Sequence, residues 1–150
     1  MSFAHDYIQQ LDRLATRVPL PRVRALHLPP DPQPGETRGE FCALELDDGS
    51  LGMSYVLLDD TLTRLRELDP SLGLAGADAL NVARQFAHAA GAEKTIGFAA
   101  ANALVRWLFD HAGFTPDASV DSLGALDPQP GDHIGMIGLF GYNFQMPNWM

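Results

Sequence analysis

The strongest constraint on the fold is a pair of apolar runs separated by a four-residue turn sequence. Residues Phe41 to Leu46 and Leu51 to Leu58 flank the turn Asp47-Asp48-Gly49-Ser50. An Asp-Gly pair between apolar runs is a strong signal for a tight β-hairpin, because glycine accepts the positive φ angles that such turns need. The sequence therefore predicts two antiparallel strands joined at this turn.

The residues before the hairpin predict a helix and a third strand. Ser2 can cap a helix whose apolar residues recur every three or four positions. They are Phe3, Tyr7, Leu11, Leu14 and Val18. Pro19 and Pro21 should end this helix. The segment Arg22 to Leu28 alternates loosely between apolar and polar residues and predicts a strand, so a three-stranded meander is expected.

Three further helices are predicted after the hairpin. Asp59 or Asp60 can cap a short one. The next should run from Ala77 to Ala90 and end at Gly91. The last, Lys94 to Ala112, is the most apolar and carries small residues on several faces, which let another backbone come close. We therefore expect an α+β fold, a three-stranded antiparallel meander with about four helices, this last helix lying centrally against the sheet.

A second structural unit is predicted after a segment rich in proline and glycine. His133 to Gly141 is almost entirely apolar and ends in glycine, a pattern typical of parallel strands that are covered on both faces. The nine residues after it are too few for a crossover helix and a second parallel strand. We expect one domain over residues 1–126 and the start of an incomplete domain over residues 127–150.

The composition favours a globular protein and excludes some classes of partner. Apolar residues make up 46% of the 150 residues, and ten basic residues against nineteen acidic ones give a net charge of −9. That sign argues against binding to nucleic-acid backbones or to anionic membranes. No secretory signal is visible, and the single cysteine, Cys42, excludes an internal disulfide. We expect a cytoplasmic protein without nucleic-acid or membrane partners.

Three motifs and their order resemble a two-domain heavy-metal chelation family. The motifs are Gly49-Ser50-Leu51-Gly52-Met53-Ser54-Tyr55 in the hairpin, Ile96-Gly97-Phe98-Ala99-Ala100-Ala101-Asn102-Ala103 in the last helix, and Gly131-Asp132-His133-Ile134-Gly135-Met136-Ile137-Gly138-Leu139-Phe140. The resemblance implies a domain similar to the enolase N-terminal fold, then a Rossmann-like domain, with the site between them. It covers most of the first 140 residues, and the chain departs from it by stopping after the first Rossmann-like strand.

The resemblance and the rule on buried polar groups single out candidate ligand-binding residues. Asparagine is unfavourable inside a helix, so Asn102 either ties its helix to a neighbouring element or faces a ligand. The amides at Gly135, Gly138 and Gly141 could cradle a phosphate, although no helix of useful length follows; tight packing and a turn are the alternative. The resemblance places Phe140 beside the cleft between the domains.

Metal chelation requires side chains that bind soft ions. The chain has one cysteine, five histidines and five methionines, but no two histidines or cysteines at ligand spacing on one element. The resemblance implies a divalent transition-metal ion as cofactor and His133 as its ligand. His88 and His111 lie in the last turns of predicted helices, where the helix dipole accounts for them. Cys42 lies among apolar residues and is interpreted as an inert buried thiol.

Three classes of function remain open from the sequence. The first is a small-ligand or metal-ion binding module, the second a non-catalytic assembly or interaction protein, and the third an enzyme completed by a separate chain. Nucleophilic catalysis has no support, because no serine or cysteine lies in a nucleophile-elbow pattern. The carboxylate pairs Asp47/Asp48 and Asp59/Asp60 lie at turn and cap positions, where they are expected for backbone reasons.

The apolar C-terminal segment predicts a homo-oligomer. A lone strand from Ile134 to Phe140 would leave both edges unpaired, and the aromatic residues of the tail would form an adhesive patch. We expect a homodimer or strand exchange that buries residues 133–150, and deletion of residues 142–150 should abolish it. Size-exclusion chromatography with light scattering measures the mass; a clean monomer at micromolar concentration would contradict the prediction.

Overall fold

The computed structural model describes residues 2–35, 39–68, 73–116, 129 and 131. The chain divides into two compact units, Met1–Thr115 and Pro116–Met150. Almost all of the described residues belong to the first unit, and the account below concerns that unit alone. The predicted domain boundary after residue 126 and the predicted strand from His133 to Gly141 lie outside the described residues and stay predictions.

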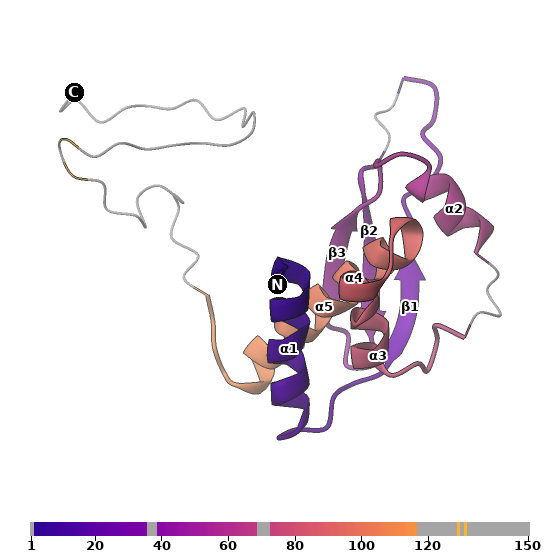
Figure 1. The fold of residues 1–150 in the computed structure, drawn as a ribbon. Coiled ribbons are helices and arrows are strands. Elements are labelled where there is room, and N and C mark those ends of the chain that lie inside the picture. The colour runs from indigo at the N-terminus through magenta and orange to yellow at the C-terminus, as the bar shows by residue number, and fades with distance from the viewer. Residues whose placement is uncertain (1, 36–38, 69–72, 117–128, 130, 132–150) are drawn as a thin grey trace. The chain divides into compact units, whose positions relative to one another are not determined.

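The first unit contains the predicted three-stranded antiparallel meander. Its strands are β1 (Val23–His27), β2 (Phe41–Leu46) and β3 (Leu51–Tyr55), in the spatial order β1-β2-β3 (Figure 1). Leu44 of β2 lies opposite Gly52 of β3, and a register shift interrupts the pairing of β1 with β2 just after Val23. The hairpin prediction is confirmed, although β3 ends at Tyr55 rather than at Leu58.

The turn between β2 and β3 is built by the residues that predicted it. The amide of Leu46 donates to the carbonyl oxygen of Ser50 at 2.9 Å, which closes the hairpin. The carboxylate of Asp48 accepts from the amide of Ser50 at 3.1 Å and from its hydroxyl at 2.7 Å. Gly49 takes a φ of +92°, a conformation that side chains rarely adopt. The Asp-Gly signal therefore has a direct structural cause.

Helices make up the rest of the described unit. They are α1 (Phe3–Ala15), α2 (Thr61–Glu67), α3 (Ala79–Ala83), α4 (Gln85–His88) and α5 (Gly91–His111). The helix predicted from Ala77 to Ala90 is thus divided at Arg84 into α3 and α4. Gly91 has a φ of +56° and begins α5 instead of ending the previous helix. The α+β class is confirmed, with the short α3 and α4 in place of one longer helix.

In α1, the apolar residues that recur along the sequence are not all residues that the structure buries. Its buried residues are Ile8 and Leu11, whereas Phe3 is 72% exposed and Leu14 is 38% exposed. The apolar stripe that begins at Phe3 is therefore only partly in the core. The reason is tertiary: α1 packs against α3 and α4, and that contact selects the stripe through Ile8 and Leu11. Ser2 occupies the N-cap position, but its hydroxyl binds His5 Nδ1 at 2.8 Å rather than a backbone amide.

The long helix α5 lies centrally, as predicted. It packs on β2 and β3 on one side and against α2, α3 and α4 elsewhere. Figure 1 shows it running between the sheet and the shorter helices, with α1 outermost. Within the described residues, no helix combines the length and apolar character that crossing a bilayer requires. The buried residues of α5 mostly have small side chains: Ala92, Thr95, Ile96, Gly97, Ala99, Ala100, Ala101, Ala103 and Leu104.

Two glycines mark the places where backbones come closest. A Cβ atom at Gly52 of β3 would lie 2.1 Å from both the amide nitrogen of Ala103 and the carbonyl oxygen of Ala99 on α5. A Cβ atom at Gly97 of α5 would lie 2.3 Å from the amide nitrogen of Phe86 on α4. Both distances are far inside van der Waals contact. The helix therefore lies against the sheet and against α4 only because these side chains are missing.

Among the described residues, the sheet is covered by α5 on one face, and its β1 edge is bound by the segment before α3. At the β1 edge, the amide of Val23 donates to Ala77 and the carbonyl of Val23 accepts from Gly76, at 2.9 and 2.8 Å. On the face away from α5, four large apolar side chains are 39–54% exposed. They are Phe41, Leu51, Met53 and Tyr55, of which Phe41 and Tyr55 form an edge-to-face ring pair across the strands.

Replacing Gly52 by alanine should strongly destabilise the protein. The new methyl group would meet backbone atoms of α5, which cannot rotate away as a side chain can, so we expect a loss of about 3 kcal/mol in the free energy of unfolding. Gly113→Ala is the matched control, since Gly113 has a φ of +62° with open space around it and should cost only about 1 kcal/mol in backbone strain. Chemical denaturation measures the free energy of unfolding of both variants. Equal losses would show that the close approach of β3 to α5 does not require glycine at position 52.

Candidate functional site

The candidate ligand residue Asn102 joins three elements of the fold. Its side-chain amide nitrogen donates to the carbonyl oxygen of Met53 at 2.9 Å, and Tyr7 Oη lies 3.5 Å from its Oδ1. Met53 lies on β3, whose outer edge has no strand beside it in the described part of the chain, and Tyr7 lies on α1. Asn102 therefore occupies an edge carbonyl that would otherwise be open to another strand. This geometry matches the structural alternative from the sequence, a half-buried amide that ties the helix to the sheet.

The surroundings of Asn102 are largely aromatic. Tyr7 stacks on Phe3 with ring centroids 5.6 Å apart and meets Phe86 edge-to-face at 6.3 Å. Phe86 in turn lies 4.7 Å from Phe98 of α5. Burial raises the pKa of the Tyr7 hydroxyl above its ordinary value. At neutral pH that group is a neutral phenol, which can donate a hydrogen bond to Asn102.

Asn102 keeps some capacity for a ligand. A primary amide offers two donor hydrogens and an oxygen with two lone pairs. The contacts to Met53 and Tyr7 use one hydrogen and one lone pair. One donor and one acceptor position are therefore left, so a ligand could be bound without breaking the tie between helix and sheet.

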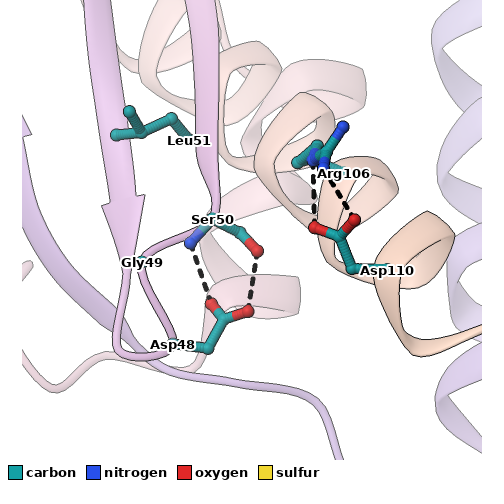
Figure 2. Close-up of a pocket in the computed structure, with 6 residues that line it drawn as sticks. All are labelled: Asp48, Gly49, Ser50, Leu51, Arg106 and Asp110. Atoms are coloured by element: carbon teal, nitrogen blue, oxygen red, sulfur yellow. Dashed lines mark hydrogen bonds and ion pairs between the residues drawn. The ribbon is translucent and has the colours of Figure 1, made fainter. Parts of the chain in front are cut away.

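The hollow beside the hairpin turn does not provide a binding site with free charges. It has a volume of about 360 Å³ and lies between the β2–β3 turn and the C-terminal part of α5 (Figure 2). Arg106 is bound to Asp110 through two contacts of 2.6 and 3.0 Å, and Asp48 is bound to Ser50. The ionic side chains in this hollow thus already have partners within the protein (Figure 2).

Metal-ligating side chains are sparse in the described part of the chain. There, no group of three or more histidine, cysteine, aspartate or glutamate residues lies close enough to hold a metal ion. Cys42 is 1% exposed, and burial raises the pKa of its thiol. The prediction that Cys42 is buried is confirmed, and its inertness toward metals stays a prediction.

The histidines of the described unit are not equivalent. His27 binds Glu45 at 2.8 Å on the open face of the sheet, and His111 stacks on Trp107 with ring centroids 4.8 Å apart. His5 and His88, in contrast, lie side by side from two different helices, with ring centroids 5.2 Å apart and nearly perpendicular planes. Sequence reasoning missed this pair because it searched for ligand spacing within one element, whereas the packing of α1 on α4 brings these two rings together.

Of the acidic residues, Asp48 has the backbone role that was predicted for it, whereas the predicted capping hydrogen bond of Asp60 is absent. Asp48 holds the hairpin turn, and Asp60 occupies the N-cap position of α2. The Asp60 carboxylate accepts from Arg64 Nε at 2.6 Å rather than from a backbone amide of the helix. That hydrogen bond lowers the pKa of Asp60, just as the hydrogen bonds from His27 and then Arg24 lower the pKa of Glu45.

The other predicted site residues cannot be placed relative to Asn102. His133, Gly135, Gly138, Phe140 and Gly141 all lie outside the described residues. The proposed ligand and metal contacts of this segment therefore stay predictions. What the structure does establish is the environment of Asn102, together with a histidine pair that the sequence did not reveal.

Comparison with known proteins identifies one family similar to this chain. The family model described as "Putative heavy-metal chelation" matches residues 39–105, somewhat less than half of the sequence. The match begins just before β2 and ends within α5, so it includes the hairpin, Asn102 and His88. No curated protein and no solved structure matches the chain.

Removing the amide of Asn102 should lower stability. In Asn102→Ala the Met53 carbonyl loses its partner, at a cost of about 1–2 kcal/mol that the better helix propensity of alanine offsets by about 0.6 kcal/mol. We expect a net loss of about 1 kcal/mol in the free energy of unfolding. The control is Tyr7→Phe, which removes only the long 3.5 Å contact and should cost less than about 0.5 kcal/mol. A fully stable Asn102→Ala protein would argue against the structural role.

Proposed function

We propose that this protein is a metal-ion binding module that chelates divalent transition-metal ions. The observation that carries the proposal is the match of the heavy-metal chelation family to residues 39–105, the segment that builds the hairpin and most of α5. In this proposal Asn102 and the segment from Gly135 to Gly141 line the site, and His133 is a metal ligand.

The charge of the chain supports a cationic ligand. The net charge of −9 creates a negative field around the protein, which raises the local concentration of cations and speeds their association. The same field opposes anionic ligands. A site that binds phosphate through the glycine amides of residues 135–141 is for this reason the weaker form of the small-ligand hypothesis.

The available donors indicate which ions would be favoured. The thiol of Cys42 is buried and its pKa is raised, so a thiolate ligand is disfavoured and the imidazoles are the leading donors. Imidazole suits zinc, copper and nickel, whereas ions that need thiolate would lack their ligand. We therefore propose copper, nickel and zinc as the ion class.

The assembly alternative depends on a different part of the chain. It requires self-association through residues 133–150, all of which lie outside the described residues. The measurement of mass given above tests it. The predicted interface includes His133 and the glycines of the proposed metal site, so the two functions would use the same segment. The family match supports metal binding, which stays the main proposal.

Calorimetric titration of the full chain with Zn²⁺ and Cu²⁺ tests the proposal. We expect saturable binding of either ion and little or no binding of Mg²⁺, because imidazole is a poor ligand for hard cations. His133→Ala should weaken the binding if this residue is a ligand. A wild-type protein that binds neither ion would refute the function, and unchanged binding by His133→Ala would remove that residue from the site.

A further inference from the structure

We propose that His5 and His88 form a surface site for one divalent transition-metal ion, distinct from the predicted ligand His133. This inference rests on the proposed function and names a pair of ligands for it. The two rings come from α1 and α4, and both side chains are exposed to solvent. They line a hollow of about 300 Å³ between the two helices, so an ion could enter from solution.

The distance between the rings fits a shared ion. Metal–nitrogen bonds of about 2.0–2.1 Å and a tetrahedral angle place the centroids of two imidazoles on one ion about 5 Å apart. The centroids of His5 and His88 are 5.2 Å apart, with an interplanar angle of 86°. The two helices therefore already hold the rings at the spacing that coordination needs, and binding would require little rearrangement of the backbone.

One ring is also oriented by a neighbour, as metal-binding histidines usually are. Ser2 Oγ lies 2.8 Å from His5 Nδ1. If Nδ1 carries the proton, it donates to the hydroxyl of Ser2, which leaves the lone pair of Nε2 for a metal. The ring of His88 has no hydrogen bond within the described part of the chain, and its only ring contact there is with His5. Neither imidazole must give up a strong interaction to bind an ion.

The charges around the hollow favour a cation. Its lining includes the carboxylates of Asp6 and Asp12. Asp12 is paired with Arg84 at 2.8 Å, whereas Asp6 lies in the first turn of α1. The carboxylates do not complete a cluster of three ligands with the histidines, so water or another exogenous ligand would fill the remaining positions. Structural zinc sites have four protein ligands, so a site with two protein ligands differs from them.

The site would also have a structural effect. It joins α1 to α4, and α1 contributes only Ile8 and Leu11 to the buried core. An ion that binds the folded protein and bridges these helices stabilises the folded state by mass action. Zinc should therefore raise the temperature of unfolding, and the increase should depend on both histidines.

The test compares five variants of the full chain by titration with Zn²⁺. His5→Ala and His88→Ala should each weaken binding at this site at least about tenfold, and should remove the thermal stabilisation by zinc. The double variant should be little worse than either single one, because the two ligands act as a unit. His27→Ala and His111→Ala are the matched controls: each removes a histidine of the same unit that lies elsewhere, and both should bind like the wild type.

Electron paramagnetic resonance with Cu²⁺ provides a readout that a merely structural role would not change. Coupling to imidazole nitrogen should be present in the wild type and reduced in either variant of the pair. His5→Gln and His88→Gln keep most of the side-chain volume and serve if an alanine variant fails to fold. Wild-type affinity and spectra in folded variants of the pair would overturn the inference.

The outcomes separate this inference from the proposed function. If the wild type binds metal and the His5 and His88 variants bind it equally well, the metal-binding function is retained and this site is refuted. Binding that is lost in the His5 and His88 variants but not in His133→Ala would support this site and remove His133. A wild-type chain that binds neither Zn²⁺ nor Cu²⁺ would refute both.

Discussion

The close approach of β3 to α5 is the constraint on which the rest of the structure depends. Gly52 has no side chain, so the backbone of β3 lies directly against the amide of Ala103 and the carbonyl of Ala99. This close approach places the side-chain nitrogen of Asn102 2.9 Å from the carbonyl oxygen of Met53 at the edge of the sheet. On another side of α5, Gly97 allows the equally close approach of Phe86 on α4. One helix of small residues thus sets the positions of both the sheet and the outer helices, including the helix that carries His88.

This architecture separates the two places where a ligand could be held. Asn102 of α5 lies between Met53 of β3 and Tyr7 of α1. Its side-chain amide has one donor and one acceptor position left for a ligand. The pair His5 and His88 lies between α1 and α4 and is open to solvent. The family similarity covers Asn102 and His88 but not α1. A metal site completed by α1 would accordingly combine a residue of the matched segment with a residue outside it.

The parts of the fold that were predicted correctly are those with a local cause. The hairpin follows from Asp48 and Gly49, whose side-chain hydrogen bonds and positive φ angle build the turn without help from distant residues. The central position of α5 follows from its small residues, and the burial of Cys42 from its apolar neighbours. The errors occurred where packing decides. Arg84 divides one predicted helix, and contact with α3 and α4 turns α1 so that Phe3 is left exposed.

The candidate site shows the same division. The sequence by itself determined that Asn102 needed partners, because an amide inside an apolar helix must be satisfied, and it determined the net charge that favours a cation. Only the tertiary structure decided that the partners are Met53 and Tyr7, and that His5 meets His88. The physical reason is that hydrogen-bonding need and charge are properties of single residues, whereas the distance between two side chains on separate helices depends on how every element between them packs.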